Sequence, residues 1–380
     1  MPPPKPSSEP AEIDHRRLET ARDLVGPAPP SRWWLRLSAA TLRGLNYLGM
    51  ILHFRIDERP PNPSFTRPIP STLSQTKGDF TLQLYTPKGY ADAAASGTTF
   101  PAVINFHGGG FTIGSATDDA RFARYITDEC KAVFISVDYR LSPEYPFPVP
   151  VDDAADALLY VIRSAAALHI DPLRLATCGF SAGGNLAFTS LLRLTDHLAS
   201  LKKTPPSAAT EEPPVPNHRF LAVVSWYPIT DYTIPRSSKR ASCPRPDLTL
   251  PAQLTTLFDA AYLADPAIDL SNPYLSPACA TDEQLNAAIP QTVILHTCEW
   301  DMLLEEGREM VGRLREEPLN REVVYKLLDE TQHAWDKAAR FGSERDLELV
   351  HYSYVRCCWE LEAVFEGRAR REGGEGDAEE

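Results

Sequence analysis

One short run of glycines around a serine constrains this chain more than any other feature. Residues 179–184 read Gly-Phe-Ser-Ala-Gly-Gly, so Ser181 has a glycine two positions away on each side. Residues 173–178 have the composition of a buried strand, and residues 185–192 that of a helix. Glycines let a strand and a helix pass close together, and the helix N-terminus directs its free amides at the serine. The sequence therefore predicts a strand, a sharp turn that exposes Ser181, and a helix.

A second glycine run lies upstream. Residues 107–110 read His-Gly-Gly-Gly and follow a strand-like apolar run. A glycine loop can turn its N–H groups outward, because no Cβ restricts the backbone. Attack of a serine on a carbonyl needs such donors around the oxyanion that forms. We expect the amides of Gly108, Gly109 and Ala182 to provide them, and His107 to brace the loop.

Two later segments end in candidate partners for the serine. The strand-like residues 292–297 precede Asp301, and the strand-like residues 323–328 precede His333. Parallel strands end at the same edge of a sheet, so side chains that follow them can meet there. We therefore predict that Asp301 and His333 converge on Ser181, in the chain order serine, acid, histidine.

The sequence leaves alternatives for both partners. Among the nine histidines only His333 and His351 follow Asp301, and His351 lies in a helical stretch with apolar neighbours, which indicates packing. Asp301 is favoured as the acid by its place just after a strand. The other acidic candidates nearby are Glu299, Glu305, Glu306 and Asp329, of which Glu305 and Glu306 are expected to open a helix.

Together these motifs resemble the hormone-sensitive-lipase-like family of α/β-hydrolases, which includes carboxylesterases and arylacetamide deacetylase. Residues 138–144, 146–148 and 272–277 add to the resemblance, which spans most of the chain. It implies the α/β-hydrolase fold, a mostly parallel central sheet with helices on both faces and a helical lid. The strictly alternating residues 80–85 predict an outer antiparallel strand.

The resemblance also implies an activity. It assigns Ser181 as nucleophile, His333 as base and Asp301 as orienting acid of a serine carboxylic-ester hydrolase that works through an acyl-enzyme. Short-to-medium acyl or small-molecule esters are the expected substrates, with no metal and no cofactor. Phe111 and Trp335 are expected in the substrate pocket. The alternatives are a non-hydrolytic, acyl-transfer or lactone-forming enzyme of secondary metabolism on the same scaffold, and a ligand-binding receptor.

The chain departs from the family's usual pattern beside two of these residues. Phe180 stands where an acidic residue is usual, and Trp335 where phenylalanine is usual. We expect Phe180 to change the packing behind the serine. We expect Trp335 to narrow the pocket beside the histidine.

Composition limits the possible partners. The 380 residues carry a formal net charge of −13, which argues against nucleic acid and against broad attraction to anionic membranes. The seven cysteines show no metal-ligand spacing, so no metal is expected. The N-terminal residues have no apolar core typical of a signal peptide. These features together favour a cytoplasmic protein that binds a small-molecule ester.

The chain is expected to divide into three parts. Residues 1–75 are expected to form an N-terminal tail and lid helices, residues 76–365 the catalytic domain, and residues 366–380 a disordered acidic tail. Within the catalytic domain, residues 202–217 predict a flexible Pro-rich insertion. Residues 231–271 are expected to add to the lid.

The N-terminal part contains one further helical pattern. Three arginines interrupt residues 32–54, so this stretch is not expected to span a bilayer. The preferred interpretation is a lid helix over the pocket mouth; the alternative is an interfacial helix that rests on a membrane. The residues that recur at helical spacing are Trp34, Leu37, Thr41, Leu45, Leu48 and Leu52.

Overall fold

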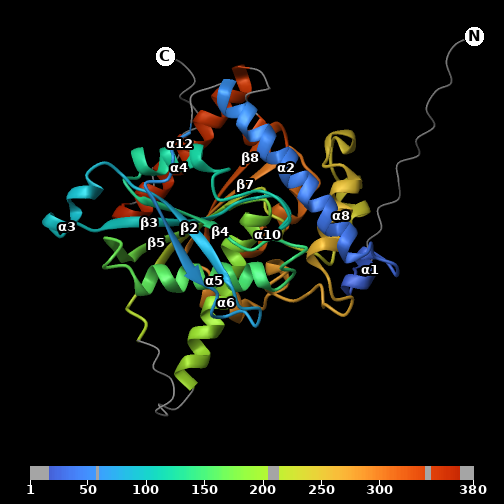
Figure 1. The fold of residues 1–380 in the computed structure, drawn as a ribbon, viewed down its shortest axis with the longest axis horizontal. Coiled ribbons are helices and arrows are strands. Elements are labelled where there is room, and N and C mark those ends of the chain that lie inside the picture. Colours follow the sequence, from blue (N-terminus) through green and yellow to red (C-terminus); the bar gives the residue numbers. More distant parts are fainter. Residues whose placement is uncertain (1–16, 57–59, 204–213, 339–343, 369–380) are drawn as a thin grey trace, which may run out of the picture.

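A single mixed sheet forms the centre of the computed structural model, which describes residues 17–56, 60–203, 214–338 and 344–368 (Figure 1). The described strands follow the order β1-β2-β4-β3-β5-β6-β7-β8. All neighbours from β4 to β8 are parallel, whereas β2 is antiparallel to both β1 and β4. The strands are β1 (Phe65–Pro70), β2 (Asp79–Tyr85), β3 (Phe100–Phe106), β4 (Val133–Asp138), β5 (Ile170–Phe180), β6 (Phe220–Trp226), β7 (Thr292–Trp300) and β8 (Glu322–Gln332).

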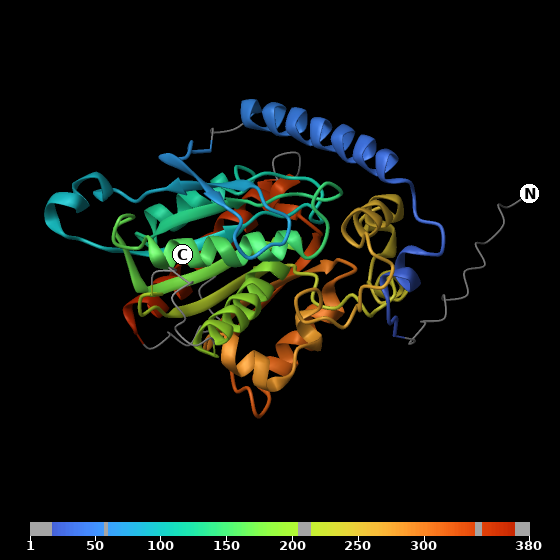
Figure 2. The same cartoon turned by 60° about the horizontal axis from the view of Figure 1, so that its bottom comes forward.

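Helices cover both faces of the sheet, which confirms the predicted fold class (Figures 1 and 2). Helices α5 (Val149–Arg163), α6 (Ala182–Lys203) and α10 (Leu304–Arg315) contribute to one hydrophobic core, and α4 (Ala120–Asp128) and α12 (Glu344–Glu366) to a second core. The remaining described α-helices are α1 (Ala21–Val25), α2 (Arg32–Ile56), α3 (Ala93–Ser96), α7 (Arg236–Ala241), α8 (Ala252–Tyr262), α9 (Asp282–Ala288) and α11 (Trp335–Ala338).

Strand β7 illustrates why the central strands are apolar throughout. Val293 and Leu295 pack into the first core, while Ile294 and Cys298 pack into the second. Successive side chains of a strand point to opposite faces, so a strand covered on both sides needs apolar residues at every position. The sheet thereby holds the carboxyl ends of its parallel strands in fixed positions.

The sheet extends further toward the N-terminus than the sequence indicated. The predicted strand at residues 80–85 is present, but it is not outermost, because β1 pairs with its free edge. Pro68 and Pro70 hide β1 from pattern analysis; proline cannot donate to a ladder and is tolerated on an edge strand. The sheet therefore begins at Phe65, inside the segment 1–75 that was expected to hold only a tail and lid helices.

Two segments that were predicted to belong to a lid lie far apart in the sequence and pack against each other. The backbone N–H of Leu18 donates to Thr233 O at 2.7 Å, and that of Ala21 donates to Ile268 O at 2.9 Å. Helix α8 contacts both α1 and α2, and α2 extends along the outside of the molecule (Figure 2). The predicted lid segment 231–271 thus holds α7 and α8, and the N-terminal helices pack against it.

Several predicted loose segments lie partly outside the described residues. Helix α6 ends at Lys203, and residues 204–213 of the predicted insertion 202–217 are not described. Helix α12 ends at Glu366, and residues 369–380 of the predicted tail are not described. The first 16 residues are likewise outside the described ranges.

Candidate active site

Ser181 occupies the predicted turn between β5 and α6. Its φ is 56°, a left-handed value that a non-glycine residue rarely adopts, and such strain concentrates at functional sites. Close packing maintains the turn, since a Cβ on Gly183 would lie 1.8 Å from Phe106 O. The glycine two residues after the serine is therefore a steric requirement of the fold.

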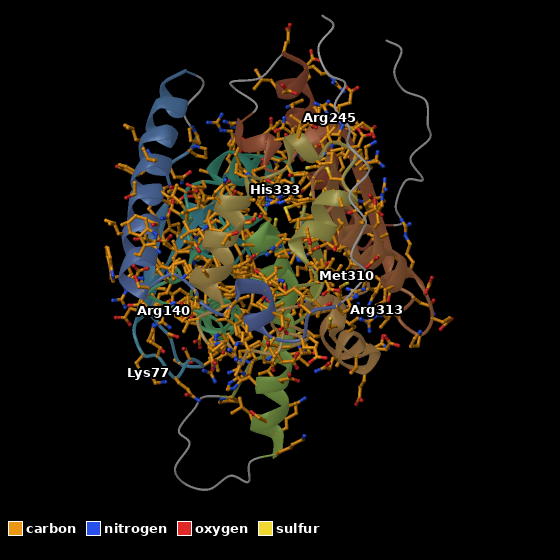
Figure 3. The ribbon with its side chains drawn as sticks, turned by 90° about the vertical axis from the view of Figure 1, so that its right-hand side faces the viewer. Lys77, Arg140, Arg245, Met310, Arg313 and His333 are labelled. Carbon is orange, nitrogen blue, oxygen red and sulfur yellow. The ribbon has the colours of Figure 1, made fainter. Side chains whose placement is uncertain are left out.

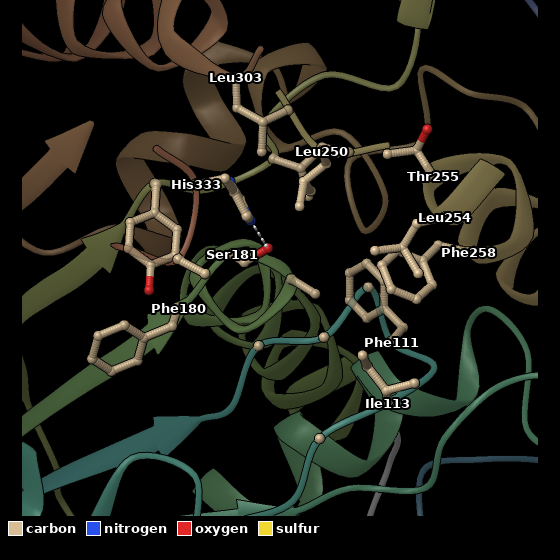
Figure 4. A pocket seen from close by; sticks show the side chains of 18 of the residues that line it. Phe111, Ile113, Phe180, Ser181, Leu250, Leu254, Thr255, Phe258, Leu303 and His333 are labelled. Carbon is tan, nitrogen blue, oxygen red and sulfur yellow. Dashed lines mark hydrogen bonds between the residues drawn. The ribbon is translucent and has the colours of Figure 1, made fainter. Parts of the chain in front are cut away.

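A continuous chain of hydrogen bonds joins the three predicted residues. His333 Nε2 lies 2.8 Å from Ser181 Oγ, and His333 Nδ1 lies 2.6 Å from Asp301 Oδ2. The second carboxylate oxygen of Asp301 accepts the N–H of Leu303 at 3.1 Å, which fixes its orientation. Asp301 directly follows β7 and His333 directly follows β8, as expected. The serine–histidine bond is drawn in Figure 4, and Figure 3 shows His333 near the middle of the molecule.

The structure separates Asp301 from the other acidic candidates. Glu299 accepts the N–H of Glu330 at 2.7 Å, and Glu305 pairs with Arg308 on the first turn of α10. Glu306 also opens α10, but it is buried and pairs with Lys239. Within the described residues, Asp301 is the one of these acids that is hydrogen-bonded to His333.

The other downstream histidine is not part of this hydrogen-bonded chain. His351 lies on α12 and is exposed, with its Nδ1 2.9 Å from the hydroxyl of Tyr125. The predicted helix is present, but the predicted packing role fits an exposed side chain poorly.

The glycine loop lies directly against the serine. A Cβ on Gly108 would be 3.5 Å from Ser181 Cβ, and one on Gly109 would be 2.2 Å from Ile113 O. Gly109 also has φ +110°, so both its conformation and its surroundings require glycine. No hydrogen bond within the described chain uses the N–H of Gly108 or Gly109. Ala182 is the first residue of α6, so its amide has no partner inside the helix.

His107 packs beside the glycine loop and contacts it directly. It is fully buried, its ring stacks on that of Tyr139 with centroids 4.3 Å apart, and its Nδ1 lies 2.8 Å from Gly108 O. The hydroxyl of Tyr139 donates to His107 O at 2.8 Å. These contacts match the bracing role expected for His107.

A mostly apolar cavity of about 240 Å³ opens beside the serine and histidine. Figure 4 shows Phe111, Leu254 and Phe258 on one side of Ser181. Phe180 lies on the other side. The segments predicted as lid contribute to the wall through α8 and through Asn46 of α2. Apolar residues of the wall include Phe111, Ile229, Leu250, Leu254, Phe258 and Leu303.

The structure brings Phe111 to the cavity but not Trp335. The chain turns at Ala334, which has φ 60° and lines the cavity itself. Trp335 is instead 7% exposed and packs in the core that α12 shares. The expectation that Trp335 narrows the pocket is therefore wrong, because the turn after His333 directs the next side chain into the core.

A buried polar network that the motifs did not indicate follows the histidine. Asp336 accepts hydrogen bonds from the hydroxyls of Tyr227 (2.5 Å) and Tyr354 (2.6 Å) and pairs with Lys337 (2.9 Å). Lys337 also pairs with Asp119 at 2.6 Å. Burial alone would raise the pKa of Asp336, but the ammonium and the two hydroxyls outweigh it and hold that pKa below its ordinary value. The ring of Tyr227 lies edge-on to that of His333, with centroids 5.0 Å apart.

Phe180 packs behind the serine among aromatic side chains. Its ring stacks parallel to that of Trp226, with centroids 5.6 Å apart. The Lys337 ammonium lies 3.6 Å from the Phe180 ring centroid, a cation–π contact where the family usually has an acid. No spacing in the sequence identifies Lys337, because Asp119 and Phe180 lie far from it along the chain.

The described residues also limit metal and membrane roles. No group of three or more His, Cys, Asp or Glu side chains in them is arranged to hold a metal ion. None of the described helices combines the length and the apolar content that crossing a membrane requires.

An α/β sheet with a serine, a histidine and an aspartate hydrogen-bonded in sequence at the carboxyl edge of its strands defines a class of protein. The chain belongs to the alpha/beta hydrolase fold family, which it matches over residues 103–337. The resemblance to hormone-sensitive-lipase-like carboxylesterases is thereby confirmed.

Individual relatives agree with this membership. An arylesterase of Saccharolobus solfataricus is 33% identical over 56% of this chain and 62% of its own length. Human arylacetamide deacetylase-like 2 is 28% identical over 77% of this chain and 79% of its own. The solved structure of a hyperthermophilic esterase from Pyrobaculum calidifontis has the same fold, with a TM-score of 0.68, 23% identity, and coverage of 88% of this chain and 97% of that one. The chain spans less than two thirds of the arylesterase.

Proposed function

We propose that the protein is a carboxylic-ester hydrolase in which Ser181 is the nucleophile, His333 the base and Asp301 the orienting acid. The observation that carries the proposal is the hydrogen-bonded chain from Ser181 through His333 to Asp301, with distances of 2.8 and 2.6 Å, on the wall of an apolar cavity. The names of the relatives, an arylesterase and an arylacetamide deacetylase-like protein among them, support esters as substrates.

The reaction follows from the positions of the groups. Ser181 Oγ attacks the ester carbonyl while His333 Nε2 takes its proton, and Asp301 holds the imidazole and stabilises its charged form. The amides of Gly108, Gly109 and Ala182 receive the negative charge that develops on the carbonyl oxygen. The protonated imidazole gives its proton to the leaving alcohol, and an acyl-enzyme remains. Water, activated by the same imidazole, then releases the carboxylic acid.

The size and chemistry of the cavity favour short-to-medium acyl groups or compact small-molecule esters. Its volume of about 240 Å³ lies just below the common range of roughly 300–1,000 Å³ for small-molecule sites. The aromatic side chains of Phe111 and Phe258 and the branched side chains of α8 favour apolar acyl groups over charged ones.

The first experiment is hydrolysis of p-nitrophenyl esters from acetate to palmitate by the wild type and Ser181→Ala. We expect the highest kcat/KM at short or medium chains. In Ser181→Ala, kcat is expected to fall by about 10⁶, as when a serine nucleophile is removed from other hydrolases. Far-ultraviolet circular dichroism and thermal unfolding show whether the variant is folded. Retention of activity in a folded Ser181→Ala protein would refute the assignment.

A fluorophosphonate probe separates this proposal from its alternatives, because it labels an activated serine whether or not water is the natural acceptor. Labelling of Ser181 without hydrolysis of any ester would favour acyl transfer or lactone formation. A folded protein that neither hydrolyses nor labels would favour a receptor.

The proposed cellular setting is the cytoplasm, with a small-molecule ester as the partner and no cofactor. All seven cysteines are free thiols in the structure, and six of them are buried, which is compatible with a reducing compartment. Fluorescence imaging of the tagged full-length chain, with cell fractionation, tests this location.

A further inference from the structure

The described part of the apolar stripe on helix α2, from Trp34 to Leu48, faces away from the protein. The exposed large side chains on it are between 49% and 70% accessible, and helical spacing places them on one side of the helix. The helix itself extends along the outside of the molecule (Figure 2). Soluble monomers rarely expose a contiguous apolar patch of this kind without an interaction that uses it. We call this surface the outer face of α2; it consists of Trp33, Trp34, Leu37, Leu45, Tyr47 and Leu48.

The opposite side of the helix packs on the protein through buried Leu35 and Ala39 and through two arginines. The guanidinium of Arg43 donates to Thr112 O at 2.8 Å and to Ser142 O at 2.6 Å, and that of Arg32 donates to Pro143 O. A helix on the surface of a globular protein normally has polar residues on its outward side, whereas α2 has large apolar side chains there as well. The outer face of α2 is therefore not explained by packing within the chain.

The charge of the helix indicates what covers this face. The sequence of α2 contains four arginines and no acidic residue, although the whole chain has a net charge of −13. Arg36 is exposed on the outer side next to the paired tryptophans, whose ring centroids are 5.8 Å apart. Tryptophan, tyrosine and arginine together suit the boundary between lipid headgroups and acyl chains, where anionic headgroups attract the cation.

Helix α12 provides an internal contrast. It also exposes aromatic side chains, at Tyr352 and Trp359, but its sequence contains six acidic residues and two arginines. An anionic membrane surface would repel that helix and attract α2. Both helices expose aromatic side chains, but only the charge of α2 suits an anionic lipid surface.

We propose that the outer face of α2 docks on the surface of an anionic lipid bilayer, with the helix lying in the plane of the headgroups. The helix borders the mouth of the cavity, because Asn46 on α2 lines it and α8, which forms its wall, packs against α2. Docking places the mouth at the membrane surface, where apolar esters concentrate. The capture of such esters rests on the proposed function; the docking itself does not.

Co-sedimentation of the full-length chain with vesicles tests the proposal. One set of vesicles is pure phosphatidylcholine. The other is phosphatidylcholine in which roughly a third of the lipid is anionic phosphatidylserine. We expect binding to the anionic vesicles, weakened tenfold or more in Trp33→Ser/Trp34→Ser, since both side chains lose their buried area. Arg36→Glu should weaken binding to anionic vesicles about fivefold or more and leave binding to neutral vesicles nearly unchanged.

Matched controls separate this result from other causes. Tyr352→Ser/Trp359→Ser removes comparable exposed area from α12 and should bind like the wild type. Ser181→Ala should also bind like the wild type, so that failure of the proposed reaction leaves the docking test intact. Absence of binding to both vesicles, or equal binding by the tryptophan variant, would overturn the proposal. So would a dimer, measured by light scattering, that the tryptophan substitutions dissociate and that does not bind vesicles.

Discussion

Asp301 lies at the far end of the hydrogen-bonded chain from Ser181, and its role can be separated from mere negative charge. Asp301→Asn keeps the size of the side chain but favours the wrong tautomer of His333. We expect kcat for p-nitrophenyl butyrate to fall by about 10⁴, as in other hydrolases of this kind.

Glu299 provides the matched control for that prediction. It lies two residues away and accepts a backbone N–H, a contact that an amide oxygen can preserve. Glu299→Gln should stay within about threefold of the wild-type kcat. Equal losses in the two variants would show that Asp301 does not orient the histidine.

Single residues were predictable from the sequence where the constraint is local. Close steric contacts and backbone angles require the glycines around Ser181 and Gly109 in the loop, and any sequence of this pattern must satisfy them. The direction of the Trp335 side chain was not predictable, because it depends on the turn at Ala334. Lys337 carried no motif, since Asp119, its partner, lies more than 200 residues away in the chain.

At the scale of elements, lid helix α8 limits the cavity through Phe258. This ring packs on the glycine loop so closely that a Cβ on Gly110 would lie 2.2 Å from its Cδ2 atom. Phe258→Ala should enlarge the acyl site and raise the ratio of kcat/KM for decanoate over butyrate esters by about tenfold, which corresponds to roughly 1.4 kcal/mol.

Leu257 is the control for the lid prediction, because it lies on the same helix but outside the cavity wall. Leu257→Ala should leave the chain-length ratio within about twofold of the wild type. If both variants shift the ratio equally, loosening of α8 rather than space beside Phe258 would be the cause.

Elements differed in how well the sequence indicated them. The parallel strands were found because burial on both faces gives continuous apolar runs. Strand β1 was missed because its prolines are compatible only with an edge, and the existence of that edge depends on the rest of the sheet. Helix α2 was found from its period, but the sequence could not show that Trp34 and Leu37 face outward.

At the scale of the whole molecule, the free energy of unfolding is expected to depend on pH, because a histidine is buried in the fold. His296 stacks on Trp226 with ring centroids 3.8 Å apart, and burial, helped by Lys326, lowers its pKa to about 3. The unfolded chain binds a proton below about pH 6.5, whereas the folded chain does not until about pH 3. The free energy of unfolding should therefore decrease as pH falls from 6.5 toward 3.

Urea unfolding at pH 7 and pH 5 measures this effect. The histidine should account for a loss of about 2 kcal/mol between these values in the wild type, and His296→Phe should lack that part of the loss. His351→Phe alters an exposed histidine and should retain the wild-type dependence. Equal pH dependence in all three proteins would contradict the buried neutral histidine.

The attachment of α2 has a consequence for how this protein tolerates sequence change. Arg32 and Arg43 hold the helix through backbone carbonyls of residues 112, 142 and 143, and Glu144 is the only side-chain acceptor of Arg43 among the described contacts. A peptide carbonyl is present whatever side chain its residue carries. Side-chain substitutions in the loops beneath the helix therefore leave these acceptors in place, whereas substitution of either arginine removes the donor.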